Sequence, residues 1–539
     1  MARPNETRGQ DSPIRTILSG LRRLFGAERI TGTLVPSVGL AIALSVTPTA
    51  LLLFNNRHAV AQATPFYRAM AATAIIAALA VLFLSRRIAP HVAGGLVAAL
   101  GYGFYSLSWV PGSNQLPSLT FLWLLISLPG AVVVVWLLSN SRLIVTLAGT
   151  AAVAVASWLV FSPLLSSNGP ATTAAPSPPE AIALAGEPIR TPNVYLFVMD
   201  GFANPDVTTE QFSEHGVSFS IADSIALLEA QGFRHDEDAT SNYGQTILSL
   251  PSTLNGAYAH TPETPLTKAE VWDIGIASIR GNNTLGNTLR AAGYEYWSAS
   301  SGAWDPSRCD PRLVDRCLDA DAGNAEAKKA VWWHTPLRWQ LAITDFRELP
   351  DPASVVESII EARSTHDTDT PYLAVAHIIA PHQPYRYEAD CSFRDGSAPG
   401  TTLEDGSRPE FRQLYADQAA CVGEFLVEAM DDLIEADPNA MIFLQSDHGS
   451  DFESSGFPTE SADWSTNYAE ERLGVFRATR IPEECRSTDS RSQSVINTMP
   501  TILSCVFGTG PELIDPRYFT TDRSGNFAEV EEISSPLSE

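Results

Sequence analysis

A long stretch without acidic residues most constrains the fold of this chain. No Asp or Glu occurs between Ile30 and Ser162, although the 539 residues include 61 of them. Apolar segments recur within this stretch, each close to the ~20 residues that a helix needs to cross a bilayer. They predict five membrane-spanning helices, at about 33–54, 69–85, 91–110, 118–138 and 143–162.

The charges around these segments predict their orientation. Residues 1–165 carry eleven Arg, no Lys and three acids, a charge of +8, so the remainder carries −26 − 8 = −34. Six of these Arg precede the first segment, which places the N-terminus in the cytoplasm by the positive-inside rule. Five crossings then place everything after Ser162 outside. A cleaved signal peptide is the rival interpretation of the first segment, and the four segments that follow disfavour it.

The chain therefore divides into four predicted parts. Residues 1–29 form a basic cytoplasmic N-terminus, 30–163 an all-α membrane domain of about five helices, 164–190 a linker rich in Pro, Ala and Ser, and 191–539 an external domain. All six cysteines lie in the external domain, which suits an oxidising compartment. Fifteen connectivities are open to six cysteines. Pairing in sequence order predicts Cys309–Cys317, Cys391–Cys421 and Cys485–Cys505.

The external domain shows alternating strand and helix patterns. Apolar runs predict strands at 193–199, 293–299, 372–380, 440–446 and 472–478. Helical periodicity predicts helices at 218–231, 283–292, 352–365, 408–436 and 492–507, with another starting at Thr246. Such alternation indicates an α/β/α sandwich around a largely parallel sheet, whose sites form at the carboxyl ends of the strands.

Polar side chains follow several of these strands. Asp200 ends the first strand, Asp447 and His448 follow a later one, His382 follows the 372–380 strand, and Thr246 begins a helix. Taken singly, an Asp-Gly pair is most often a turn and a Pro-His-x-Pro segment a rigid loop. Their shared position at strand ends changes that reading. Two carboxylates, an imidazole and a hydroxyl can surround one divalent cation.

The segments that carry these residues also resemble a known family. They are NVYLFVMDGF (193–202), SNYGQTILSLPSTLNG (241–256), HIIAPHQPY (377–385) and FLQSDHGSDF (443–452). They resemble the sulfatase-like branch of the alkaline phosphatase superfamily. Among its members, the chain looks closest to the membrane-anchored lipoteichoic acid synthases and lipid A phosphoethanolamine transferases. Those proteins also place an external catalytic domain after five membrane spans.

The resemblance implies roles for individual residues. Asp200, Thr246, Asp447 and His448 match metal-site positions, and Thr246 also matches the nucleophile. His382 matches a histidine that contacts the transferred group. His377, Arg308 and Arg338 are weaker candidates for substrate contact. The implied cofactor is one divalent metal, Zn²⁺ or Mn²⁺, with Mg²⁺ or Ca²⁺ as alternatives.

The resemblance implies an enzyme that transfers a phospho-alcohol onto a membrane lipid or envelope glycan. Asp200 stands where those transferases commonly have Glu, which leaves a phosphodiesterase or phosphatase open. A sulfuric-ester hydrolase would need the C/S-x-P-x-R sequence, which does not occur near Thr246.

Two alternatives of other classes are an inactive sulfatase-like sensor and a transporter. The complete presumed ligand set disfavours the sensor, and the absence of ionisable residues inside the predicted spans disfavours the transporter. A net charge of −26 argues against a nucleic-acid partner. The predicted location is the cytoplasmic membrane, with the catalytic domain outside.

Overall fold

A computed structural model describes two units of the chain. The described residues of the N-terminal unit are mostly helical, the C-terminal unit is built around a β-sheet, and each unit is treated by itself. The described residues are 34–55, 64–105, 187–301, 305–318, 351–366, 370–394, 409–452, 463–488, 494–509, 512–522, 527 and 529–537.

The described part of the N-terminal unit consists of three apolar helices. They are α2 (Leu34–Asn55), α3 (Thr64–Leu84) and α4 (Pro90–Tyr105), and they coincide with the first three predicted spans. Windows of 18 residues in α2 and 19 residues in α3 are long and apolar enough to cross a membrane. Helix α4 has 16 residues, fewer than the ~20 of a full span. The fourth and fifth predicted spans lie outside the described residues.

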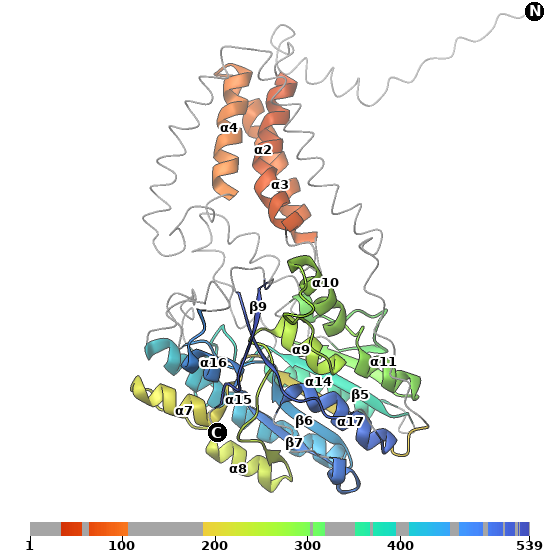
Figure 1. The fold of residues 1–539 in the computed structure, drawn as a ribbon. Coiled ribbons are helices and arrows are strands. Elements are labelled where there is room, and N and C mark those ends of the chain that lie inside the picture. Colours follow the sequence, from red (N-terminus) through yellow and green to blue (C-terminus); the bar gives the residue numbers. More distant parts are fainter. Residues whose placement is uncertain are drawn as a thin grey trace, which may run out of the picture. The chain divides into compact units, whose positions relative to one another are not determined.

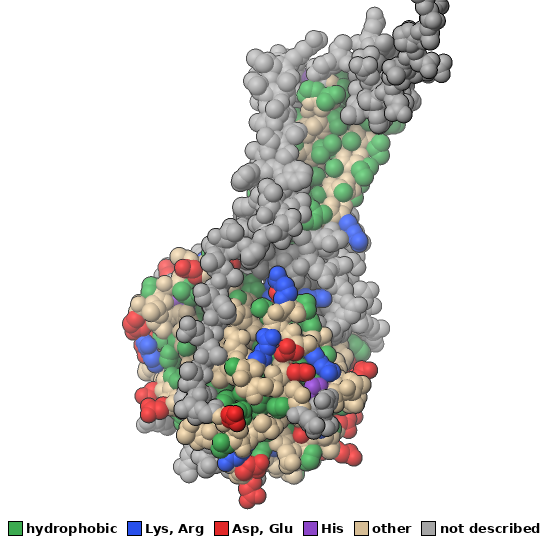
Figure 2. Space-filling view, turned by 90° about the vertical axis from the view of Figure 1, so that its right-hand side faces the viewer, with side chains coloured by type: hydrophobic (Ala, Val, Ile, Leu, Met, Phe, Trp, Pro, Cys, Tyr) green, Lys and Arg blue, Asp and Glu red, His purple; other side chains and the backbone are tan. Residues whose placement is uncertain are grey.

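Large hydrophobic side chains face outward from α3. Ile75, Ile76, Leu79 and Phe83 are each at least 60% exposed. Figure 2 shows hydrophobic side chains over the surface of the described helices of this unit. A surface of this kind is typical of contact with lipid or with another apolar surface.

A seven-stranded mixed sheet organises the C-terminal unit (Figure 1). Its order is β2-β7-β6-β1-β5-β3-β4, and β1 pairs in parallel with both β5 and β6. The antiparallel strands β7 and β2 extend the sheet beyond β6. The strands are β1 (Val194–Met199), β2 (Arg234–His235), β3 (Glu295–Ser300), β4 (Arg316–Cys317), β5 (Tyr372–Ile378), β6 (Met441–Ser446) and β7 (Arg477–Arg480).

Side-chain alternation along the central strands builds two cores, one on each face of the sheet. In β1, Tyr195 and Phe197 join one core, whereas Val194 and Leu196 join the other. The first core is covered by α7 (Pro205–Glu214), α8 (Ala222–Ala230), α14 (Pro352–Ser364) and α15 (Pro409–Ala436). The second is covered by α9 (Thr246–Asn255), α10 (Lys268–Ile279), α11 (Thr284–Ala291) and α17 (Thr498–Phe507). The predicted three-layer α/β/α arrangement is therefore present, around a mixed sheet.

One predicted strand is partly wrong. The 472–478 prediction begins inside α16 (Thr466–Leu473), and β7 starts only at Arg477. The apolar run L-G-V-F belongs to the end of that helix and to a buried connection that follows it. Val475 and Phe476 pack into hydrophobic cores but lie outside the strands. The prediction also missed α7, α10 and a separate ribbon of β8 (Tyr518–Thr521) and β9 (Val530–Ile533).

The cysteines are paired in sequence order. Disulfides join Cys309 to Cys317, Cys391 to Cys421 and Cys485 to Cys505, with Cα–Cα distances of 5.8, 4.9 and 5.0 Å. The second disulfide connects the segment after β5 to α15.

Helices α9 and α10 approach each other closely at Gly275. A Cβ atom at this position would lie 2.5 Å from the Ile247 carbonyl oxygen. We expect Gly275→Val to lower the free energy of unfolding by about 2 kcal/mol, as overpacking does in a filled core. Guanidinium unfolding of the purified chain measures the effect. The matched control is Ala269→Val on the exposed face of α10, which should cost only about 0.5 kcal/mol through helix propensity. Equal losses in both variants would show that the contact does not limit packing.

Candidate metal centre

Two aspartates lie side by side where β1 and β6 end. The parallel register pairs Met199 with Ser446, so Asp200 and Asp447 follow at the same edge of the sheet. The Ser446 hydroxyl holds the two ends together: it accepts a hydrogen bond from the Phe202 amide and lies 2.6 Å from the Met199 carbonyl oxygen. Asp200 and Asp447 are 6% and 2% exposed, so both carboxylates are removed from bulk water.

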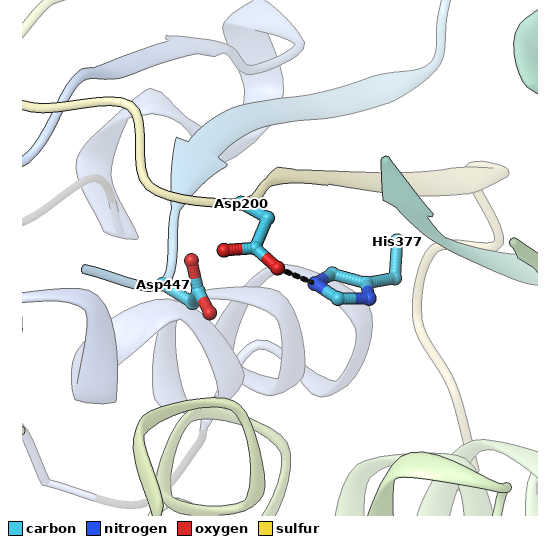
Figure 3. A group of neighbouring side chains, drawn as sticks. All are labelled: Asp200, His377 and Asp447. Atoms are coloured by element: carbon cyan, nitrogen blue, oxygen red, sulfur yellow. Dashed lines mark ion pairs between the residues drawn. The ribbon is translucent and has the colours of Figure 1, made fainter. Parts of the chain in front are cut away.

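His377 enters the cluster from β5. It pairs with Val198, and along β5 it shares the strand face of Leu373 and Val375, which pack into the core beneath α9. Its Nε2 lies 3.6 Å from Asp200 Oδ2, and Figure 3 shows the two aspartates and His377 converging. One ligand atom from each of these three residues lies within 4.8 Å of the others. His377 was predicted only as a weak substrate contact, and the structure places it among the candidate metal ligands.

His448 and Thr246 complete the group. His448 Nε2 lies 3.4 Å from Asp200 Oδ1, 3.5 Å from Asp447 Oδ2 and 3.2 Å from Thr246 Oγ1. His448 Nδ1 donates to the Gly449 carbonyl at 3.0 Å. Nε2 is then the unprotonated nitrogen, and its lone pair is on the side of the two carboxylates. Thr246 is the first residue of α9 and is half-buried. The four predicted ligands therefore lie together.

Backbone geometry requires glycine on both sides of the cluster. Gly201 has φ +73°, and a Cβ there would lie 3.6 Å from His382 Cβ. A Cβ at Gly449 would clash with the Glu471 carbonyl oxygen of α16. These two glycines let the Asp200 and His448 segments turn away from the sheet without strain.

The loop after β5 brings His382 next to the backbone at the end of β1. Its amide donates to the Asp200 carbonyl at 2.9 Å, and its Nδ1 donates to the Gln383 carbonyl at 2.8 Å. Gln418 on α15 holds this loop by donating to the carbonyl oxygens of Pro381 and His382. The backbone of His382 is therefore fixed from two sides, while its side chain is half-buried.

Arg472 is a buried cation that the sequence did not reveal. Its Nε donates to the Gly244 carbonyl and its Nη1 to the Gly449 carbonyl, both at 2.7 Å. It thereby joins the loop before Thr246 to the loop after His448. Its Nη2 lies 3.5 Å from His448 Nε2. Arg472 falls at the start of the wrongly predicted strand, where no pattern distinguished it from any other strand residue.

Burial dominates the electrostatics of the centre. Desolvation raises the pKa of Asp200 to about 7, against the opposing charge of Arg472. Desolvation and the neighbouring Asp200 charge raise the pKa of Asp447 to about 7. Burial and the nearby His382 lower the pKa of His377 to about 3, which keeps its ring neutral and able to coordinate.

The donor set fits a divalent cation. Asp200 Oδ1 and Asp447 Oδ2 are buried oxygens without a hydrogen-bond partner, and a bound cation would satisfy both. Two carboxylates with neutral imidazole nitrogens suit Zn²⁺ or Mn²⁺. Asp200, Asp447, His377 and His448 are the residues that would hold the ion, with Thr246 beside them.

The two arginine candidates stay predictions. Arg308 follows the short 3-10 helix η2 (Asp305–Ser307) beyond β3 and stays a prediction as a substrate contact. Arg338 lies outside the described residues.

Comparison with known proteins places this centre in a family. The family described as Sulfatase matches residues 192–509, more than half of the chain. The chain belongs to the sulfatase family. That region contains every residue of the centre, and the members of this family are enzymes. No curated protein matches this sulfatase-family chain.

Several solved structures are similar to this sulfatase-family chain at low identity. The C-terminal periplasmic domain of EcEptC from Escherichia coli is 13% identical with a TM-score of 0.39, covering 61% of this chain and 90% of that one. The lipooligosaccharide phosphoethanolamine transferase EptA from Neisseria meningitidis is 12% identical with a TM-score of 0.41, covering 88% and 96%. The lipoteichoic acid synthase LtaP from Listeria monocytogenes is 12% identical with a TM-score of 0.36, covering 62% and 78%.

The raised carboxyl pKa values predict how the metal-free protein responds to pH. Below about 4 the carboxyls are protonated in the folded and unfolded states, so this stabilising contribution is fully present. It is lost as pH rises through the folded value of about 7, because burial disfavours the ionised carboxylates and the Asp200 charge adds to this at Asp447. Chelator-treated protein should therefore lose thermal stability between about pH 5 and pH 8. Added Zn²⁺ or Mn²⁺ should restore it at the higher pH.

Asp447→Asn should remove much of this pH dependence and most of the metal response. Asp432→Asn, on the exposed face of α15, is the matched control and should retain both. Thermal melts at the two pH values, together with metal analysis after dialysis, provide the measurements. A metal response that persists in Asp447→Asn would remove Asp447 from the ligand set.

Proposed function

We propose that this protein is a membrane-anchored, metal-dependent transferase that moves a phospho-alcohol onto a cell-envelope lipid or glycan through Thr246. The 3.2 Å contact between Thr246 Oγ1 and His448 Nε2 carries the proposal, because it places the hydroxyl against the candidate metal ligands. Family membership supports an ester-transferring enzyme. Donor and acceptor remain part of the proposal.

The position of Thr246 suits a nucleophile. It is half-buried, so a substrate can reach it, whereas Asp200 and Asp447 behind it are buried. As the first residue of α9, it lies where the amides of the first turn favour an anionic group, and no side chain caps this end. A divalent cation bound here would lower the pKa of the hydroxyl and neutralise charge on the phosphoryl oxygens.

The chain's own residues supply the remaining steps. Thr246 Oγ attacks the phosphorus, the Oγ–P bond forms as the bond to the leaving alcohol breaks, and the hydroxyl proton is released. Protonated His382 donates a proton to the departing alkoxide. An acceptor alcohol then attacks the phosphothreonine and gives its proton to His382 as the Oγ–P bond breaks. Thr246 Oγ takes up a proton from solvent, which replaces the one released to solvent in the first step. Arg472 keeps the Thr246 and His448 loops in register during both steps.

The N-terminal helices support the membrane part of the proposal. Helix α3 exposes Ile75, Ile76, Leu79 and Phe83, whose contact with water would be unfavourable. Arg86 and Arg87 follow directly and suit the cytoplasmic side of the bilayer. Anchoring would keep the catalytic unit near lipid-linked substrates.

The hydrolase alternative differs only in the acceptor. Water in place of an alcohol in the second step would give a phosphodiesterase or phosphatase of the same family. Comparing the envelope lipids and glycans of a deletion strain with wild type separates the two. A missing phospho-alcohol substituent, restored by the wild-type gene, supports transfer. An unchanged envelope, together with phosphodiesterase activity of the purified chain, would contradict it.

Thr246→Ala tests the nucleophile. We expect activity to fall by at least about 10³-fold, because the substitution removes the hydroxyl that contacts His448 Nε2, while the bound metal falls little. Thr246→Ser should retain measurable turnover and form a phosphoserine. Substitution of Thr365 by Ala, at the exposed end of α14, is the matched control and should leave turnover unchanged. Full activity of Thr246→Ala with intact metal content would end the assignment.

A further inference from the structure

Helix α15 carries two buried polar side chains one turn apart, Tyr415 and Gln418. They are 2% and 1% exposed. The Tyr415 ring packs at steep angles against Phe212 and Phe452, with ring centroids 5.8 and 5.5 Å away. A phenylalanine would fill the same space, so the core does not require the hydroxyl. Burying a polar group is unfavourable unless it forms hydrogen bonds, and the partners of these two side chains therefore indicate what they do.

The Tyr415 hydroxyl bonds the turn that follows Asp200. It donates to the Gly201 carbonyl and accepts from the Ala203 amide, both at 2.9 Å. The Gly201 amide of the same turn donates to Asp447 Oδ1 at 3.3 Å. Tyr415 therefore fixes the backbone that follows Asp200, together with the amide that contacts Asp447. Residues that orient the ligands of a metal in this way affect how tightly the metal is held.

The Gln418 side chain bonds the loop that contains His382. Its Nε2 donates to the carbonyl oxygens of Pro381 and His382 at 3.0 and 3.1 Å, and its Oε1 accepts from the Arg386 amide at 2.6 Å. One primary amide thus makes three hydrogen bonds to this loop, at His382 and on both sides of it. A proton donor must lie within hydrogen-bond distance of the group that it protonates, so the position of this loop matters for His382.

We propose that Tyr415 and Gln418 are positioning residues with separate tasks. Tyr415 sets the geometry of the candidate metal ligands through the turn after Asp200, and Gln418 sets the position of His382 relative to the leaving group. The tasks are separate because the hydroxyl and the amide bond different loops. The Tyr415 part rests on the metal centre alone, whereas the Gln418 part rests on the proposed function.

Tyr415→Phe tests the first task, because it removes only the hydroxyl. The Zn²⁺ affinity of the full chain in detergent micelles is measured by competition with a chromogenic chelator. We expect the Kd for Zn²⁺ to rise by about tenfold. The matched control is Tyr296→Phe, at the amino end of β3, whose buried hydroxyl accepts from Asn283 Nδ2 at 2.9 Å. It should lower the melting temperature and leave the Kd unchanged.

The Tyr415 assignment is overturned if Tyr415→Phe binds Zn²⁺ as the wild type does. An equal rise in Kd in both variants would overturn it as well, because it would reflect a general loss of stability. A wild type that binds neither Zn²⁺ nor Mn²⁺ removes the metal centre, and the Tyr415 assignment with it.

Gln418→Met tests the second task, because it keeps the length of the side chain and removes its hydrogen bonds. The probes are methyl phenyl phosphate and methyl p-nitrophenyl phosphate, which differ only in the leaving group. Phenolate needs a proton donor more than p-nitrophenolate does. We therefore expect kcat/KM to fall by about tenfold or more for the phenyl ester and by less than about threefold for the p-nitrophenyl ester. Gln413→Met, at an exposed position of α15, is the matched control and should leave both values unchanged.

His382→Ala distinguishes a failure of this assignment from a failure of the proposed function. If His382→Ala affects mainly the phenyl ester and Gln418→Met lowers both esters equally or neither, the Gln418 assignment is wrong and the role of His382 stands. If His382→Ala itself lowers both esters equally, His382 is not the proton donor, and the Gln418 assignment falls with it. Turnover of neither ester by the metal-loaded wild type would contradict the proposed function and this assignment together.

Discussion

The burial of two carboxylates next to each other is the constraint on which the rest of the catalytic unit depends. Asp200 and Asp447 stand at the ends of adjacent strands, removed from water, and each has an oxygen without a hydrogen-bond partner. Without compensation such a pair is destabilising. Its surroundings act to hold it: Ser446 ties the strand ends, the Gly201 amide donates to Asp447, and the buried charge of Arg472 opposes their repulsion.

This constraint connects the fold to the chemistry. Parallel pairing of β1 with β5 and β6 brings residues that are up to 247 positions apart to one edge, from Asp200 to Asp447. Helix α9 then places Thr246 over that edge, and its close packing on α10 at Gly275 sets how near it lies. The proposed nucleophile Thr246, the candidate ligands beside it and the proposed proton donor His382 are all positioned by this one strand arrangement. The candidate metal-binding aspartates are thus also the residues that follow the ends of the central strands β1 and β6.

The sequence predicted the centre better than its surroundings. Asp200, Thr246, Asp447 and His448 were identifiable because each follows a predicted strand or begins a helix, and strand ends of a parallel sheet converge. His377 was undervalued because it lies inside its strand, where a histidine more often packs in a core. Along β5, His377 lies on the same face as Val375, which is the face covered by α9. Assigning His377 to that face requires the register of the sheet.

Arg472 shows why the rest could not be read from sequence. It donates to the backbone carbonyls of Gly244 and Gly449. Every residue has a backbone carbonyl, so the sequence does not indicate which residues accept these hydrogen bonds. Arg472 lies in the last turn of α16, and the apolar residues that follow this helix have the pattern of a strand. The acidic residues of α7 have the same origin: α7 was not predicted, and Glu210 meets Glu470 of α16 only through the tertiary fold. Motifs therefore locate groups that act on a substrate, whereas the residues that position those groups become visible only when the loops they join are placed.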